Sequence, residues 1–167
     1  MSASDRLSAM FSERIVVLDG AMGTQVQPLD LSEADVRGER FAGHGRDLRG
    51  DIDVLSLTRP DDVERIHRAY LEAGADIVTT NTFTSHPATQ REYALEDHVY
   101  ELGLAGAAIA RRAVAAHGSG LVAGSLGPTS VTLSLSPHVD DPSFRAATFD
   151  EMRVTPRWPA ASSTAAP

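Results

Sequence analysis

The sequence predicts an α/β fold in which short parallel strands alternate with helices. Two observations support this prediction. Three short apolar runs, each ended by polar residues, glycine or proline, have the length and composition of strands in a parallel sheet. The segments between these runs are long enough to contain helices, as the crossover connections of parallel strands require.

The three apolar runs are expected to form the strands of this sheet. The first is short and wholly apolar, which predicts a strand that is covered on both faces. The second is rich in β-branched residues, which favour strands. The runs and the residues that end them are Ile15–Leu18 before Asp19-Gly20, Ile77–Thr80 before Asn81, and Leu121–Leu126 before Gly127-Pro128.

Two amphipathic helices are expected between the strands. Asp61–Ala73 has apolar residues three or four positions apart and acidic residues in its first turn, where the helix dipole favours them. Gly74 is placed to end this helix. The second helix is expected over Asp97–His117, with its first aspartate as the cap and Gly118 as the end.

The remaining segments are predicted to be less regular. Residues 27–58 form a long connection, in which Asp51–Leu57 is a candidate short strand. Residues 1–12 are interpreted as an N-terminal tail, and a helix is expected to begin within Ser143–Met152. Residues 153–167 have no periodicity and contain three prolines, which interrupt helices, so they are interpreted as an aberrant or disordered tail.

Composition and charge exclude several classes of protein. The 167 residues include 15 basic and 23 acidic side chains, a formal net charge of −8, and every basic residue is an arginine. Without a basic stripe, neither nucleic acid nor a membrane surface is expected as a partner. The sequence shows no signal peptide and no apolar stretch approaching the roughly 18 residues of a membrane span, so we expect a cytoplasmic protein. The absence of cysteine excludes disulfides, thiolate metal sites and cysteine nucleophiles.

Candidate ligand-binding residues follow the predicted strands, because ligands bind at the carboxyl ends of parallel strands. Asp19 is suited to accept hydrogen bonds from a ligand ammonium group, although it could instead be a structural turn residue. Asn81, the only asparagine, can both donate and accept, with a turn or cap role as the alternative. Gly20 would allow close approach to the backbone. The stretch from Asp19 to Thr24 lacks the Lys-Ser/Thr ending of a phosphate-binding loop.

The six histidines predict neither a metal site nor a catalytic residue. No pair has the helical spacing of metal ligands, and no HExxH motif is present. His67 and His98, on the predicted helices, are expected to lie on the surface or to be hydrogen-bonded. His138 is expected to form a loop charge pair with Asp140 or Asp141.

Taken in order, these segments resemble the homocysteine S-methyltransferase family. The RGERF segment and the long first connection are similar in particular to the N-terminal module of cobalamin-dependent methionine synthase. The resemblance covers about residues 12–152. It rests on RIVVLDGAMGTQVQ, on DVRGERFAGHGRDLRGDIDVLSLTRPDDVERIHRAYLEAGADIVTTNTF, and on VAGSLGPT and SPHVDDPSFRAATFDE.

This resemblance implies a (β/α)8 barrel that binds homocysteine and transfers a methyl group to it, giving methionine. Residues 13–152 would then be a partial homocysteine-binding domain with about three βα units of an incomplete barrel. Asp19 and Gly20 would contact the amino-acid end of homocysteine, and Asn81 would line the same pocket. In the family, three cysteine thiolates hold zinc, and methylcobalamin on another module supplies the methyl group.

The sequence departs from the family pattern in two places and lacks the zinc ligands. Ser130-Val131-Thr132 replaces an Asn-Arg-Thr-like stretch, and His138 stands where an acidic residue is usual. Because the chain has no cysteine, we expect an inactive fragment that binds no cofactor alone and whose partners are the missing barrel half or other methionine synthase modules. Two alternatives are half of a split enzyme completed by another chain, and a small module that binds an amino acid through Asp19 and Asn81.

Overall fold

The computed structural model describes residues 2–153 of the chain. The predicted tail at 153–167 therefore lies outside the described residues, except for Arg153, which ends the last helix. The α-helices are α1 Ala3–Glu13, α2 Met22–Val26, α3 Glu33–Arg37, α4 Leu55–Thr58, α5 Pro60–Glu72, α6 Pro87–Gln90, α7 Val99–His117 and α8 Phe149–Arg153. The strands are β1 Ile77–Thr79 and β2 Leu121–Ala123, and the 3-10 turns are η1 Gln27–Leu29, η2 Ile52–Val54, η3 Arg91–Tyr93 and η4 Glu96–His98.

A small parallel sheet confirms the predicted α/β class. Strands β1 and β2 pair in parallel, with Val78 opposite Val122. The first predicted strand adds one parallel bridge, between Leu18 and Ile77. Backbone hydrogen bonds from Asp19 N to Ile77 O (2.9 Å) and from Ile77 N to Val17 O (3.2 Å) hold it beside β1. Among the described residues, the sheet therefore has two strands and one bridged segment.

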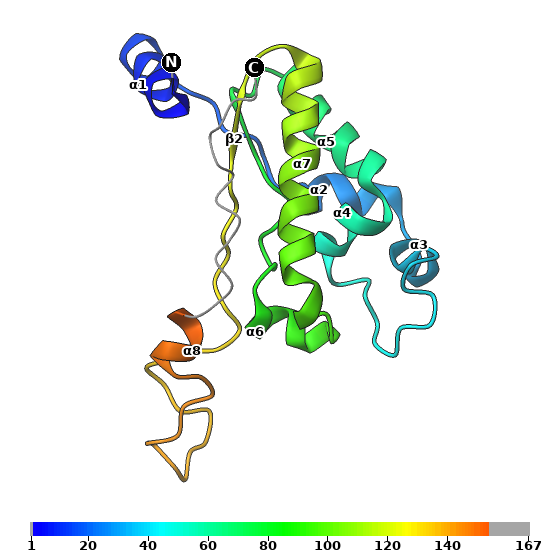
Figure 1. The fold of residues 1–167 in the computed structure, drawn as a ribbon, viewed down its shortest axis with the longest axis vertical. Helices are drawn as coiled ribbons and strands as arrows, with labels where there is room; N and C mark the ends of the chain where they lie inside the picture. The colour runs from blue at the N-terminus through cyan, green and yellow to red at the C-terminus, as the bar shows by residue number, and fades with distance from the viewer. Residues whose placement is uncertain (1, 154–167) are drawn as a thin grey trace.

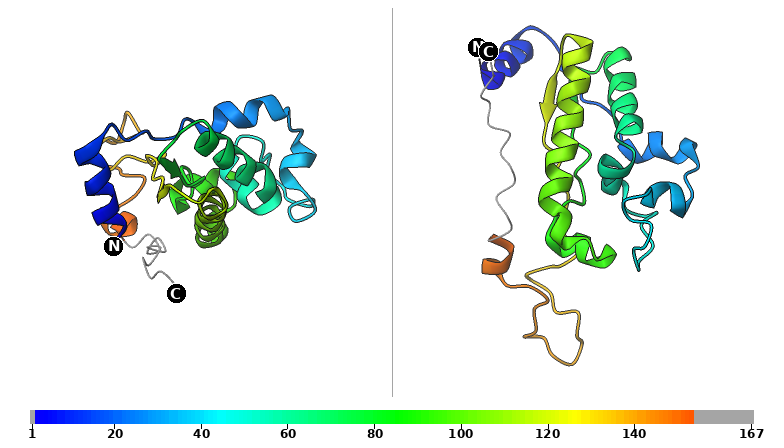
Figure 2. Two further views of the ribbon diagram at one scale, coloured as in Figure 1. Left: turned by 90° about the horizontal axis from the view of Figure 1, so that it is seen from above. Right: turned by 45° about the vertical axis from the view of Figure 1, so that its right-hand side comes forward.

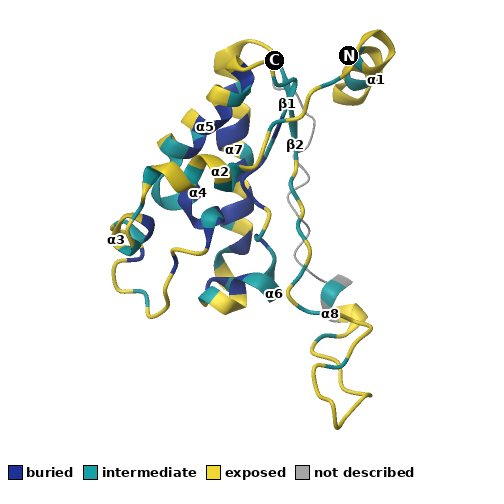
Figure 3. Ribbon diagram, turned by 180° about the vertical axis from the view of Figure 1, so that it is seen from behind, coloured by how far each residue is buried: buried dark blue, intermediate teal, exposed yellow. Residues whose placement is uncertain are grey.

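Helices α5 and α7 cover one side of this sheet. They pack against each other and against β1, and both lie on the same side of the strands (Figures 1 and 2). Both helices were predicted, as were their glycine ends: Gly74 has φ +101° and Gly118 has φ +84°. Figure 3 shows the buried residues along these helices. The two apolar clusters consist of Val36, Phe41, Leu48, Val54, Leu55, Val63, Leu95 and Ile109, and of Leu71, Val78, Ala110 and Ala113.

A glycine in α7 brings this helix close to the residues that follow β1. A Cβ atom at Gly106 would lie 2.6 Å from Cγ2 of Thr82 and 3.1 Å from the backbone oxygen of Asn81. Real Cβ atoms essentially never approach another atom to 2.6 Å, so a side chain at Gly106 would require Thr82, the backbone at Asn81 or the helix itself to shift. The packing of α7 therefore fixes the position of the segment that ends β1.

Three predictions of local structure are wrong. The first strand is not covered on both faces, since Ile15 is 87% and Leu18 is 56% exposed, and the helices that pack against the sheet, α5 and α7, lie on one side of it. Asp51–Leu57 forms η2 and the start of α4 instead of a strand, because the Asp51 side chain accepts a hydrogen bond from Asp53 N and begins a helical turn. The cap of α7 is His98, because the 3-10 turn η4 precedes the helix.

The surroundings of three histidines can be compared with the predictions made for them. His67 is fully buried and neither ring nitrogen has a hydrogen-bond partner, so the prediction for it is wrong. His98 lies 3.5 Å from Glu101, which agrees with its predicted surface position. His138 packs edge-on against Phe144, with 4.4 Å between ring centroids, and forms no ion pair with the neighbouring aspartates in the described part of the chain.

The segment after β2 leaves the helical body. Figure 1 shows this yellow-to-orange segment running away from α5 and α7 and ending in α8, with the predicted helix start near Phe149. Strand β2, the third predicted strand, ends at Ala123, three residues before the predicted end at Leu126. Of the helices in residues 2–153, none is long and apolar enough to cross a membrane.

Candidate functional site

A pocket of about 390 Å³ lies at the carboxyl ends of the parallel strands. Its walls come from the turn after the first strand, the residues after β1 and β2, and the segment that leads into η2. This is the edge at which ligands bind in parallel α/β folds, so the predicted location is the location of a pocket. The lining residues are Gly20, Ala21, Met22, Gly23, Gly50, Ile52, Asp53, Thr79, Thr80, Asn81, Phe83, Thr84 and Ser125.

Asp19 joins the first strand to β1. Thr79 donates to its carboxylate twice, from the backbone nitrogen (2.9 Å) and from Oγ1 (3.0 Å). The side chain is half-buried, and burial raises its pKa although the bonds from Thr79 act in the opposite direction. Asp19 stands directly before Gly20, the first residue of the pocket wall. The structure thus gives Asp19 a role between the strands, and its role toward a ligand stays a prediction.

Gly20 makes room for a tyrosine of α5. A Cβ atom here would lie 2.9 Å from the hydroxyl oxygen of Tyr70, which donates a hydrogen bond to the backbone oxygen of Ala21 (3.1 Å). The missing side chain therefore lets Tyr70 fix the turn that borders the pocket. The contact of Gly20 with a ligand stays a prediction.

Asn81 is buried and held in one orientation. Its Nδ2 donates to the backbone oxygen of Ile52 (2.9 Å) and to Oγ of Ser56 (3.1 Å). These bonds tie the end of β1 to the η2–α4 segment, so they connect two walls of the pocket. Gly20 and Asn81, predicted as parts of one site, line this pocket together.

Two aspartates that the sequence analysis did not single out are buried beside the pocket. Oδ2 of Asp53 accepts hydrogen bonds from Thr84 N (2.8 Å) and from Ser85 Oγ (2.7 Å). Oδ1 of Asp51 accepts from Thr84 Oγ1 (3.1 Å). Burial, followed by the charge of Asp53, raises the pKa of Asp51 to about 6, and burial also raises the pKa of Asp53. The feature of the sequence that could have identified them is the presence of two aspartates within the otherwise apolar run Asp51–Leu57, which was interpreted as a strand.

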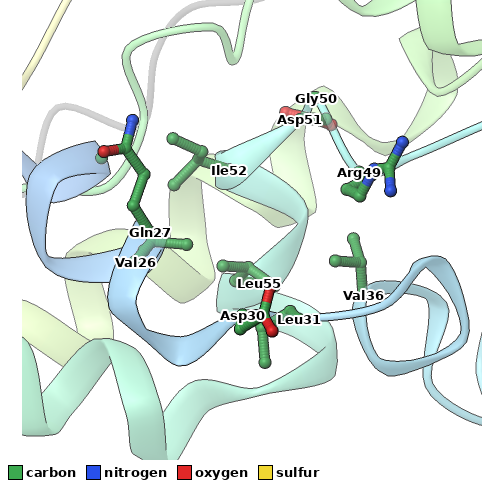
Figure 4. A pocket seen from close by; sticks show the side chains of 11 residues that line it. Val26, Gln27, Asp30, Leu31, Val36, Arg49, Gly50, Asp51, Ile52 and Leu55 are labelled. Atoms are coloured by element: carbon green, nitrogen blue, oxygen red, sulfur yellow. The ribbon is translucent and has the colours of Figure 1, made fainter.

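A second pocket, of about 370 Å³, shares Gly23, Gly50 and Ile52 with the first. Figure 4 shows Val26 and Gln27 on one side of it, and Val36 and Arg49 on the other. Asp51 belongs to this second wall, whereas Asp53 belongs to the first pocket. The segment from Gly50 to Asp53 therefore borders both cavities.

The described residues place no cluster of metal ligands at the candidate site. Among residues 2–153, no group of three histidine, cysteine, aspartate or glutamate side chains is placed to hold a metal ion. The full sequence contains no cysteine, so the three thiolates that the resemblance implies for zinc are not present. The residues at the pocket can accept hydrogen bonds from an ammonium group and enclose a small polar molecule.

A sequence model of the family described as Homocysteine S-methyltransferase matches residues 16–157. The match continues five residues past Met152, where the resemblance was expected to end. Two similar solved structures are the oxidized and metallated forms of the homocysteine methyltransferase MmuM from Escherichia coli. The oxidized form is 27% identical with a TM-score of 0.57, and the metallated form is 26% identical with a TM-score of 0.55.

The match covers most of this chain but less than half of each MmuM chain. It covers 73% of this chain in both comparisons. It covers 40% of the oxidized MmuM chain and 41% of the metallated one, so this chain corresponds to less than half of their length.

Proposed function

Because the chain belongs to the homocysteine S-methyltransferase family, we propose that it forms the homocysteine-binding part of an enzyme that methylates the thiol of homocysteine to give methionine. The observation that carries this proposal is the pocket of about 390 Å³ at the carboxyl ends of the strands. Residues of two family motifs, DGAMGT and TNTF, form much of its wall. A pocket of this size accommodates a small amino acid.

Asp19 and Gly20 bind the amino-acid end of homocysteine in this proposal. The ammonium group donates a charge-assisted hydrogen bond to the Asp19 carboxylate, whose orientation the two bonds from Thr79 fix. The absence of a side chain at Gly20, which lines the pocket, would let the carboxylate end of the ligand approach the backbone of this turn. Asn81, held by Ile52 and Ser56, keeps the opposite wall in place. A rigid site loses less conformational entropy on binding.

We extend the proposal to the class of methyl donor. The RGERF segment and the long first connection support a cobalamin-dependent methionine synthase, in which methylcobalamin on another module donates the methyl group. The described residues supply no contact by which to assign a corrinoid site, so the assignment depends on this resemblance in sequence.

We also propose that these 167 residues transfer no methyl group by themselves. Zinc held by thiolates does not fit this chain, which has no cysteine. A free thiol is mostly protonated at neutral pH and is then a weak nucleophile. Groups that activate the thiol would have to come from residues outside this sequence, either from a partner chain or from further parts of a longer protein.

Calorimetric titration tests the binding role. We expect the chain to bind homocysteine and to bind 4-mercaptobutanoic acid, which lacks the amino group, at least tenfold more weakly, because a charge-assisted hydrogen bond is lost. Asp19→Asn should remove this preference, whereas the exposed Asp97→Asn should keep it. Absence of homocysteine binding, or equally tight binding of both ligands, would contradict the proposed role.

A separate assay tests the proposed lack of turnover. The purified chain is incubated with methylcobalamin and homocysteine, and methionine is measured by mass spectrometry. We expect no methionine above the level without protein. Methionine formation that Asp19→Asn abolishes would show that these residues suffice for the reaction.

A further inference from the structure

Tyr70 connects the apolar core to the turn that borders the first pocket. It lies in the last turn of α5, and it packs against the apolar cluster that contains Leu71 and Val78. Its hydroxyl group donates a hydrogen bond to the backbone oxygen of Ala21 (3.1 Å). One side chain therefore contacts both the core and the wall of the pocket.

The backbone of Tyr70 is itself fixed by the end of α5. Ala75 N donates to the backbone oxygen of Tyr70 (3.0 Å), and Gly74 N donates to that of Leu71 (2.9 Å). These two bonds, with Gly74 at φ +101°, form a Schellman motif, which ends a helix in a defined geometry. The tyrosine side chain thus starts from a well-defined position.

The turn that Tyr70 contacts forms one wall of the pocket, since residues 20–23 all line it. At its start, the turn is held by the two bonds from Thr79 to the Asp19 carboxylate. At its end, α2 begins without a side-chain cap, because the residue before the helix is Ala21. The hydrogen bond from Tyr70 to Ala21 therefore supports the end of the turn that has no cap of its own.

Gly20 and Tyr70 depend on each other sterically. A Cβ atom at Gly20 would lie 2.9 Å from Oη of Tyr70 and 3.0 Å from its Cε1. A side chain at this position would therefore displace either the tyrosine ring or the turn. The hydrogen bond to Ala21 requires that position 20 has no side chain.

We propose that Tyr70 is a positioning residue for homocysteine, which holds residues 19–21 in the conformation that binds the amino-acid end of the ligand. This inference rests on the proposed function. Tyr70 is not among the described residues that line the pocket, so it acts through the turn and does not touch the ligand. A turn that is already ordered loses less conformational entropy when the ligand binds.

Calorimetric titration of Tyr70→Phe tests this role, because the variant keeps the ring and loses the hydroxyl group. We expect its affinity for homocysteine to fall about fivefold, the effect of one typical hydrogen bond. Its preference for homocysteine over 4-mercaptobutanoic acid should fall as well, since the turn carries Asp19. A purely structural defect would weaken both ligands equally and leave this preference unchanged. Tyr100→Phe, at a tyrosine of α7 that is 56% exposed, should retain the affinity and the preference of the wild type.

A double-mutant cycle with Gly20→Ala tests the coupling between the two residues. In the wild-type background, Gly20→Ala displaces Tyr70 from Ala21 and also reduces the room for the ligand. In Tyr70→Phe the hydrogen bond is already absent, so Gly20→Ala should weaken homocysteine binding by a factor that is several times smaller. Its direct effect on the ligand is the same in both backgrounds and cancels in the comparison.

A measurement on proteins that keep Tyr70 applies if Tyr70→Phe does not fold. The sequence contains three tyrosines, and Tyr93→Phe and Tyr100→Phe assign their resonances in spectra of protein labelled with ¹³C at the tyrosine Cζ atom. We expect homocysteine to shift the Tyr70 resonance and to leave that of Tyr100 unchanged.

The outcomes separate this inference from the proposed function. If the wild type binds homocysteine, then an unchanged affinity or an unchanged preference in Tyr70→Phe, additive effects in the cycle, or an unshifted Tyr70 resonance would each overturn the role of Tyr70 alone. If the wild type does not bind homocysteine, both the proposed function and the role of Tyr70 are overturned.

Discussion

The first strand and β1 are similarly apolar in sequence, yet they differ in how far they are buried. Val78 at the centre of β1 is fully buried, whereas Ile15 is 87% and Val17 is 49% exposed. The difference comes from cover, since α5 and α7 pack on β1, whereas Ile15, Val17 and Leu18 of the first strand are about half exposed or more. An apolar run therefore predicts a strand whose side chains need to be packed against other elements. It does not show that the described part of this chain supplies those elements.

Acid should destabilise the covered region through His67. Burial lowers the pKa of this histidine from 6.5 to about 4. Between these values the unfolded chain binds a proton that the folded chain does not, so stability falls as the pH falls from 6.5 to 4. The full loss below pH 4 is about 3 kcal/mol. Above pH 6.5 the histidine is neutral in both the folded and the unfolded chain, so none of this stability is lost.

Comparison with His67→Leu isolates this contribution. Asp51 works in the opposite direction, because its raised pKa gives stability at low pH that is lost as the pH rises toward 6. Asp51 is present in both proteins, so it cancels in their difference. Urea unfolding at pH 7 and pH 4.5 should show a variant at least as stable as the wild type at pH 7 and relatively more stable at pH 4.5. A difference independent of pH would show that His67 titrates normally.

Matched truncations of two valines should show the difference between the strands directly. Val78→Ala removes buried methyl groups and leaves a cavity, which should cost about 2 kcal/mol. Val17→Ala, in the half-exposed strand, should change stability by less than about 0.5 kcal/mol. Urea unfolding measures both. Equal losses would mean that the first strand is buried in solution by a second copy or another segment.

The sequence predicted those elements whose signals are local. Helices α5 and α7 have apolar stripes and glycine ends, and both were located within two residues. The segment at Asp51–Leu57 was misassigned because its apolar run fits a buried strand or a buried helix equally well. Its side-chain cap, from Asp51 to the Asp53 amide, became visible only in three dimensions.

The candidate site shows the same division. Gly20 and Asn81 were candidates because they follow parallel strands, the family resemblance implied that they share a pocket, and both line the pocket of about 390 Å³. Asp51 and Asp53 were missed, since their importance depends on burial beside Thr84 and Gln90, which lie more than 30 residues away in sequence. Sequence patterns locate the edge of a sheet more readily than they identify long-range partners.

The smallest expected effect concerns Asp76, whose carboxylate lies beside β1 and helps to hold the first strand in place. Asp76 accepts hydrogen bonds from Arg14 (2.6 Å) and from Val17 N (2.9 Å), and Arg14 holds its pKa at about 2. Asp76→Asn keeps an oxygen for the Val17 amide and loses the charge pair, whereas Asp76→Ala loses both.

Because surface ion pairs contribute little to global stability, we expect similar unfolding midpoints for both Asp76 variants. Hydrogen exchange should distinguish them. The amides of Val17 and Asp19 should exchange faster in Asp76→Ala than in Asp76→Asn, while the Thr80 amide, bonded to Ala123, stays protected. If Thr80 loses protection to the same extent, the first strand unfolds together with the β1–β2 pair, and the two regions form one cooperative unit despite their different burial.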